Sequence, residues 1–139
     1  MNGRLVLATL AGTIVSFLLG WLVFGVITAG LYEANMVHYE GLYRNPPNLI
    51  GIFAAQLVSA FLLAYIFQKW ANISSFSSGV VTGALISFLI ILSFDISIWA
   101  FMNLFAGKKI FFLDILLNTA MGGVIGGVIG FVLGYKKNK

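Results

Sequence analysis

The sequence predicts an all-α integral membrane protein, a bundle of four transmembrane helices joined as antiparallel hairpins. The chain has 139 residues, of which 60% are hydrophobic and 9% charged, and its mean hydropathy is +1.03. A soluble domain carries roughly a quarter charged residues, so this class is excluded. The apolar residues are gathered in four runs, each longer than the roughly 18 residues of a spanning helix.

The four runs make a single domain over residues 1–139. Lipid offers no water to pair with backbone groups, so each run is expected to form a helix. The one long connection, an outer loop over 32–48, contains Pro46 and Pro47, which stop a helix and start the second span. The short connections near Asn72 and Gly107 favour antiparallel hairpins. The spans cover about residues 5–31, 49–67, 76–105 and 110–135.

Four spans place both ends of the chain on the same side of the membrane. The basic residues on that side are Arg4, Lys69, Lys136, Lys137 and Lys139, and those on the other side are Arg44, Lys108 and Lys109. The excess predicts that both termini are cytoplasmic. The net charge of +4 lies at the ends of the apolar runs. This placement suits anionic lipid headgroups, so the expected partner is the lipid bilayer and no nucleic acid.

Small residues recur every four positions along three of the spans, with GxxxG spacing. Such a stripe stays on one face of a helix, where another backbone can approach closely. Two uses are open: packing of the first span on the fourth within one chain, or contact with a second copy in a homo-oligomer. The stripes are Gly122, Gly126, Gly130 and Gly134 in the fourth span, Ala8, Gly12, Ser16 and Gly20 in the first, and Gly79, Gly83 and Ser87 in the third.

Three polar side chains are expected at similar depth in the membrane. Counted from the outer ends at 1.5 Å per residue, Asp95 lies about 15 Å deep, Gln56 about 11 Å and Asn118 about 12 Å. An ionisable group inside the membrane suggests function. A protonated Asp95 would donate a hydrogen bond to Gln56 or Asn118. Asp95 is then a structural polar clamp, a proton- or cation-coupled binding site, or part of a water-filled crevice.

Asp114 is the second acid inside a span. It is expected about 6 Å deep, in the first turn of the fourth span, where a helix N-terminus favours negative charge. Lys108 or Lys109 would supply the opposing cation. The expected role is a capping and anchoring acid. A difference of about 9 Å in depth argues against a pair between Asp95 and Asp114.

No motif for catalysis, a cofactor or a metal is found. The chain has no cysteine, no phosphate-binding loop, no nucleophile elbow and no zinc-protease helix. His38 lies near Glu33 and Glu40 in the outer loop, but a metal site needs three or four ligands of fixed geometry. An enzyme is therefore not expected.

Several short motifs resemble small bacterial four-helix membrane proteins grouped as a domain of unknown function. The resemblance implies the four-helix fold, a location in a bacterial inner membrane and no activity. It rests on Ala11-Gly12, Phe17 and Leu19-Gly20-Trp21-Leu22 in the first span, on residues 79–83, on Gly107-Lys108-Lys109 with Asp114 after it, and on the glycine-rich end.

Two functions follow from these patterns. The first is a non-enzymatic integral membrane protein, packed through glycine-rich faces and oligomeric. The alternative is a small transporter or channel with a polar site around Asp95, Gln56 and Asn118, and its small-molecule or ion ligand is left open.

Overall fold

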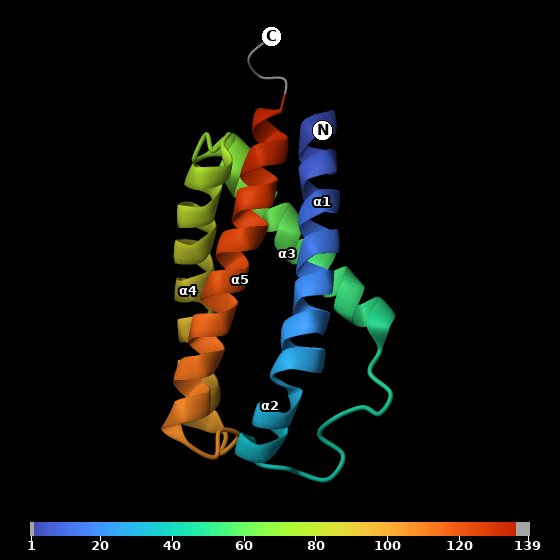
Figure 1. Ribbon diagram of the computed structural model, residues 1–139, viewed down its shortest axis with the longest axis vertical. Helices are drawn as coiled ribbons and strands as arrows, with labels where there is room; N and C mark the ends of the chain where they lie inside the picture. Colours follow the sequence, from blue (N-terminus) through green and yellow to red (C-terminus); the bar gives the residue numbers. More distant parts are fainter. Residues whose placement is uncertain (1, 136–139) are drawn as a thin grey trace.

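Six helical elements follow one another along residues 2–135, the part of the chain that the computed structural model describes (Figure 1). Four helical stretches are long and apolar enough to cross a membrane. The chain is therefore an integral membrane protein with four spans, whose apolar outer faces contact lipid. The elements are α1 Gly3–Gly20, the π-helix η1 Trp21–Ile27, α2 Ala29–Asn35, α3 Leu49–Lys69, α4 Phe76–Phe101 and α5 Lys108–Gly134.

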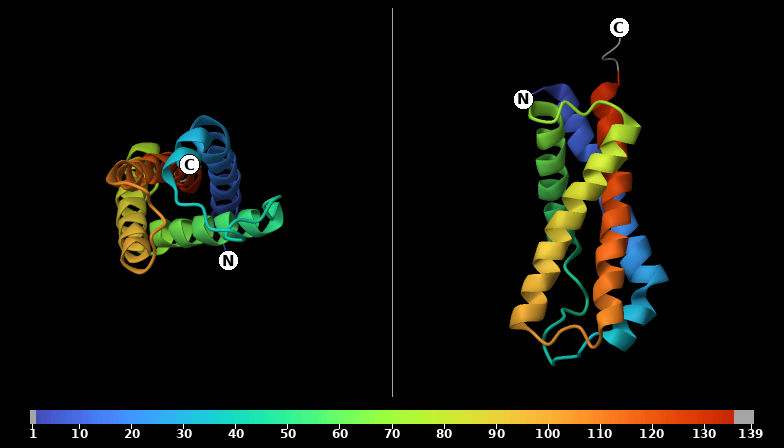
Figure 2. Two further views of the ribbon diagram at one scale, coloured as in Figure 1. Left: turned by 90° about the horizontal axis from the view of Figure 1, so that it is seen from below. Right: turned by 90° about the vertical axis from the view of Figure 1, so that its left-hand side faces the viewer.

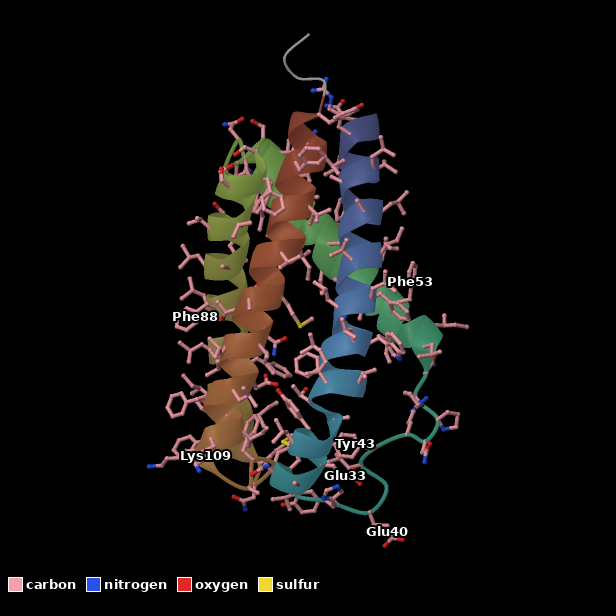
Figure 3. The ribbon with its side chains drawn as sticks, in the orientation of Figure 1. Glu33, Glu40, Tyr43, Phe53, Phe88 and Lys109 are labelled. Atoms are coloured by element: carbon pink, nitrogen blue, oxygen red, sulfur yellow. The ribbon has the colours of Figure 1, made fainter. Side chains whose placement is uncertain are left out.

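Successive spans run in opposite directions, which confirms the predicted all-α bundle of antiparallel hairpins. The start of α1 and the end of α5 lie at the same end of the bundle (Figure 1). Glu33, Glu40 and Lys109 lie at the other end (Figure 3). We call these the terminal end and the loop end. Which end faces the cytoplasm stays a prediction, and Lys136, Lys137 and Lys139, on which it depends, lie outside the described residues.

The first span differs from the single helix expected over 5–31. After Gly20 the chain continues as η1, and the backbone N–H of Thr28 donates to the carbonyl oxygen of Val23 at 2.8 Å. The Thr28 hydroxyl donates to the same oxygen at 2.7 Å. These bonds reach five residues back, which widens the helix and ends the span at Ile27. The expected loop over 32–48 therefore begins as a helix, because α2 occupies Ala29–Asn35.

Glycines on both helices bring the backbones of α4 and α5 into contact. A Cβ built on Gly79 would lie 2.2 Å from the carbonyl oxygen of Gly126. One built on Gly83 would lie 2.4 Å from the carbonyl oxygen of Gly122. No side chain fits in these spaces, so only glycine allows so close an approach. The contact between α4 and α5 is the most extensive one between helices in the bundle.

The glycine stripe of the fourth span thus meets mainly the third span, and not the first span or a second copy as expected. Farther along, Cβ atoms on Gly130 and Gly134 would meet the carbonyl oxygens of Ser75 and Ser74. The face is filled within the chain along its length. α1 also packs on α5, but through Gly12, whose Cβ would lie 2.7 Å from the side chain of Ile129.

The buried apolar core lies toward the terminal end. It joins α1, α3 and α5, and in Phe67, Ala64 and Ile129 no surface is exposed. Close packing of this kind stabilises the terminal end of the bundle. The core consists of Leu5, Ala8, Leu63, Ala64, Phe67, Ile129 and Leu133.

Replacing Gly126 by alanine should destabilise the bundle. The new Cβ would lie 2.4 Å from the carbonyl oxygen of Gly79 and 2.7 Å from the Cα of Gly83, so the helices must separate. Overpacking of this kind costs about 1–3 kcal/mol. Thermal unfolding in lipid nanodiscs measures the effect.

The matched control is Gly20→Ala, since a Cβ at Gly20 meets nothing within 4 Å. Alanine in a helix is favoured over glycine by about 0.5–1 kcal/mol, so this variant should melt no lower than the wild type. Equal melting temperatures for the two variants would contradict the glycine contact.

Candidate functional site

Asp95 is the buried acid of the bundle. Its residue is 2% exposed, and it lies on α4 in the half nearer the loop end. Its Oδ2 atom has no hydrogen-bond partner among the described residues. Buried polar atoms in proteins are nearly always paired, and each exception needs an explanation. This unpaired oxygen is therefore the first candidate for function.

Asp114 on α5 lies beside Asp95 and collects hydrogen bonds from two other residues. The carboxyl group of Asp95 lies near enough to that of Asp114 to interact with it electrostatically. The Tyr32 hydroxyl donates to Oδ1 of Asp114. The side-chain amide of Asn118 donates to Oδ2 at 3.0 Å. We refer to Tyr32, Asp95, Asp114 and Asn118 as the acid cluster.

The expected difference in depth between Asp95 and Asp114 is wrong. It placed the end of the third span at Phe105 and the start of the fourth at Ile110. In the structure α4 ends at Phe101 and α5 begins at Lys108. Asp95 is therefore six residues from one helix end and Asp114 six residues from the other, and the two lie at the same depth, about 9 Å from those ends.

Asp114 is also not the capping acid that was expected. The first turn of α5 contains no acidic residue. The residue before the helix is Gly107, which has no side chain to cap it. The carboxyl group of Asp114 lies past the first turn and binds Tyr32 and Asn118. Its hydrogen bonds join α2 to α5.

The short helix α2 brings Tyr32 to the acid cluster. The π-helix η1 and the break at Thr28 turn the chain, so that α2 packs on the loop end of α5. The ring of Tyr32 stands edge-on to that of Phe24, with 5.3 Å between centroids. After α2 in the chain, the backbone N–H of Val37 donates to the carbonyl oxygen of Leu104 at 2.8 Å. This bond fastens the outer loop to the connection between α4 and α5.

Tyr32 is held as a neutral hydrogen-bond donor. The pKa of Tyr32 is raised well above its ordinary value of about 10. Partial burial of the hydroxyl is the larger cause, and the hydrogen bond to Asp114 and the acidic charges add to it. Tyr32 therefore keeps its proton wherever the acid cluster is intact.

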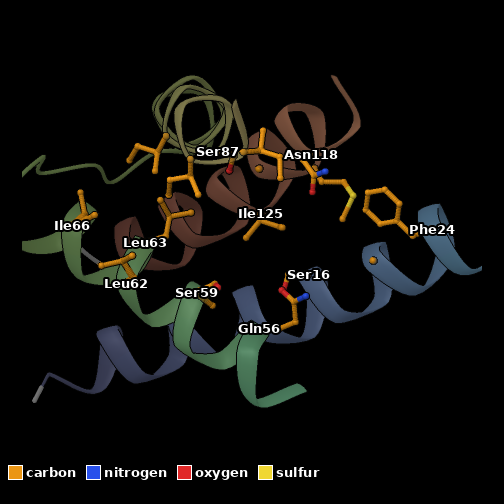
Figure 4. A pocket seen from close by; sticks show the side chains of 17 residues that line it. Ser16, Phe24, Gln56, Ser59, Leu62, Leu63, Ile66, Ser87, Asn118 and Ile125 are labelled. Carbon is orange, nitrogen blue, oxygen red and sulfur yellow. The ribbon is translucent and has the colours of Figure 1, made fainter. Parts of the chain in front are cut away.

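A pocket of about 420 Å³ lies next to the acid cluster, between α1, α3, α4 and α5 (Figure 4). Its volume lies in the range of small-molecule sites. Asn118 lines this pocket while its side-chain amide donates to Asp114, so one residue belongs to both. On the wall opposite Asn118, the hydroxyl of Ser16 donates to Oε1 of Gln56 at 2.8 Å. Ser59 and Ser87 add two more hydroxyl groups to the lining.

The expected layer of Asp95, Gln56 and Asn118 is therefore split in two. Asn118 joins the acid cluster through Asp114, whereas Gln56 bonds Ser16 on the opposite wall. The pattern of apolar runs does not identify Tyr32 or Phe24 as residues of the site. The one sequence signal for Tyr32 is its position shortly after the end of a long apolar run.

Among residues 2–135, no group of three or more histidine, cysteine or acidic side chains is placed to hold a metal ion. His38 and Glu40 are exposed in the outer loop. The acid cluster offers two carboxyl groups, an amide and a hydroxyl. This set suits a proton or a hydrogen-bonding ligand.

Comparison of the chain with family models, curated proteins and solved structures finds no match. The resemblance to a group of small bacterial membrane proteins is therefore supported only for the class: a small membrane protein with four spans. The function has to be argued from the site itself.

Replacing Tyr32 by phenylalanine should change how stability depends on pH. In the unfolded chain Tyr32 loses its proton near pH 10, and in the folded protein it keeps it. Its contribution to stability is complete below about pH 10 and is lost as the pH rises above that value. The wild type should thus lose stability above about pH 10 more steeply than Tyr32→Phe does, as measured by unfolding midpoints at each pH.

The control for this measurement is Tyr43→Phe, because Tyr43 is 59% exposed in the outer loop. This variant should keep the wild-type slope. A Tyr32→Phe protein with the same slope as the wild type would show that Tyr32 is not held by Asp114.

Proposed function

We propose that the chain is a small, non-enzymatic transporter that takes a ligand into the pocket and exchanges a proton at Asp95 and Asp114. The observation that carries this proposal is the unpaired Oδ2 of buried Asp95, next to a second carboxyl group and a pocket. An acid that only clamped two helices would have both oxygens satisfied. The geometry thus favours a site that binds and releases.

The hydrogen bonds indicate which acid holds the proton. Tyr32 donates to one oxygen of Asp114 and Asn118 donates to the other, and both bonds stabilise the charged carboxylate. Asp95 is buried, and its Oδ2 atom has no donor among the described residues. In this proposal Asp114 is therefore the charged acid and Asp95 carries the proton. Loss of this proton would leave two like charges side by side in a medium of low dielectric constant, which is costly.

Asn118 couples the pocket to the proton. A ligand that hydrogen-bonds to the Asn118 amide competes with the bond from Asn118 to Asp114. Any weakening of that bond makes the charge on Asp114 less stable, and this changes how firmly the neighbouring Asp95 holds its proton. By linkage, the proton then changes the affinity for the ligand to the same degree.

Access of protons to the acid cluster is controlled at the loop end in this proposal. The buried core lies toward the other end of the bundle. At the loop end, Phe24 lines the pocket and Tyr32 packs edge-on against it. Release of Tyr32 from Asp114 would free α2 to move. In this proposal the conformational change occurs in the π-helix η1 before α2, since π-helices occur often at functional sites.

The other function, an oligomeric scaffold packed through glycine faces, has less support. The stripe from Gly122 to Gly134 is filled by α4 and the connection before it. A homo-oligomer stays a prediction, and it would need a different surface. The mass of the detergent-free protein in nanodiscs tests it.

Proton flux into liposomes tests the proposed transport. Purified wild type is reconstituted with a pH-sensitive dye inside, and an inward proton gradient is applied. We expect uptake above that of protein-free liposomes, and Asp95→Asn should reduce it to the protein-free rate because asparagine cannot release a proton. The matched control is Glu40→Gln, an exposed acid in the outer loop, which should leave uptake unchanged.

Infrared spectroscopy gives a second readout of the same variants. The chain has only four acidic residues, so the C=O band of a protonated carboxyl group can be assigned. It should be present in the wild type and in Glu40→Gln, and absent in Asp95→Asn. Equal proton uptake by the wild type and Asp95→Asn, or an absence of the band in the wild type, would contradict the proposal.

A further inference from the structure

The lining of the pocket contains no charged side chain. Its polar groups are the hydroxyls of Ser16, Ser59 and Ser87 and the amides of Gln56 and Asn118, all of them neutral. The remaining wall is made mostly of leucine and isoleucine. An anionic ligand would have to leave water without a counter-charge and would lie beside two acids, which is unfavourable. The lining therefore selects against anions and suits a neutral molecule.

Hydrogen-bonding groups are concentrated toward the loop end of the pocket, although Ser87 lies nearer the terminal end than Ile90 does. Gln56 lies on the part of α3 nearer the loop end, and its bond to Ser16 holds the amide at that end. Leu63 and Ile66 lie farther along α3 toward the terminal end, and Ile125 lies at a similar position on α5. Figure 4 shows Ser16 and Gln56 together and Leu62, Leu63 and Ile66 apart from them. A ligand that fits has one hydrogen-bonding end and an apolar body.

The pocket opens toward lipid between α3 and α4. α3 packs on α1 and α5, and α4 packs on α5, but α3 and α4 form no comparable contact. The two helices lie near each other at the terminal end and separate toward the loop end (Figure 2). One lining residue from each helix stands at this opening: Leu62 is 49% exposed and Ile90 is 57% exposed. Both exposed surfaces face the hydrocarbon region of the bilayer.

We propose that the pocket binds an uncharged amphiphile, a molecule with a hydroxyl- or amide-type end and an apolar body, which enters from the bilayer between α3 and α4. The hydrogen-bonding end lies among Ser16, Gln56 and Asn118, and the apolar body lies along Leu63 and Ile125. The inference names the substrate class of the proposed transporter and rests on that function for its biological meaning. Binding itself is measured without any flux.

Photolabelling with matched probes tests the inference. Three probes carry the same diazirine-bearing alkyl chain and end in an alcohol, in a carboxylate or in a methyl group. Each is added to wild-type protein in nanodiscs of neutral lipid, and the labelled peptides are mapped by mass spectrometry. The alcohol should label pocket residues of α3, α4 and α5 in a saturable manner, and an excess of unlabelled alcohol should compete. The carboxylate and the hydrocarbon should label the pocket at least about fivefold less, as expected for loss of one good hydrogen bond.

Two variants separate the pocket from the lipid-facing surface. Ile90→Trp places a large ring at the opening and should reduce alcohol labelling by a similar factor. Leu89→Trp is the matched control, because Leu89 is 56% exposed on the same helix and does not line the pocket. Gln56→Leu removes the polar end of the site and should abolish the preference for the alcohol over the hydrocarbon. Its thermal unfolding shows whether the fold is retained.

Two results would overturn the inference. Equal labelling of the pocket by all three probes would mean that ordinary lipid chains fill it. A preference for the carboxylate would mean that the ligand is anionic. Either result leaves the proton flux of the wild type and Asp95→Asn untouched, so a wrong substrate class is distinguishable from a wrong function. Selective binding of the alcohol without proton flux would uphold the site and remove the transport.

Discussion

Glycines at the contact between α4 and α5 let two backbones touch, and the other features of the bundle depend on this contact. It fixes the register of the two helices, with Gly79 against Gly126 and Gly83 against Gly122. The same register sets Asp95 beside Asp114 near the loop end. α4 packs chiefly on α5 and makes no comparable contact with α3. The space between them becomes the pocket.

The bundle separates its stabilising contacts from its polar groups. The dry core near the terminal end joins α1, α3 and α5, and the glycine contact holds α4. The loop end carries the acid cluster, with Asp95 buried and one oxygen unpaired. A costly group of this kind persists only where other contacts outweigh it. The helix α2 covers the cluster and supplies the Tyr32 hydroxyl, which ties the first span to the last.

Length and hydropathy were enough to predict four antiparallel spans, because lipid permits few other structures for such a chain. The partner of the glycine stripe was not predictable. The spacing shows that the residues on one helix face are small, but it does not show which helix packs against that face. The prediction placed Asp95 and Asp114 at different depths because it misplaced the end of the third span, Phe101, by four residues and the start of the fourth, Lys108, by two. Apolar residues continue past Phe101, and α5 begins with two lysines, so hydropathy located neither helix end. The break at Thr28 was hidden for the same reason, and with it the approach of Tyr32.

A disulfide between α4 and α5 is the most direct measure of their register. The Cβ of Ala84 lies 3.5 Å from a Cβ built on Gly123, within the range that a disulfide requires, and the chain has no cysteine of its own. Ala84→Cys with Gly123→Cys should oxidise within one chain and lose both thiols to labelling. Leu85→Cys with Gly123→Cys should keep its thiols, because Leu85 is 56% exposed. Free thiols in the first pair, or a disulfide between two chains, would contradict the contact from which the acid pair and the pocket follow.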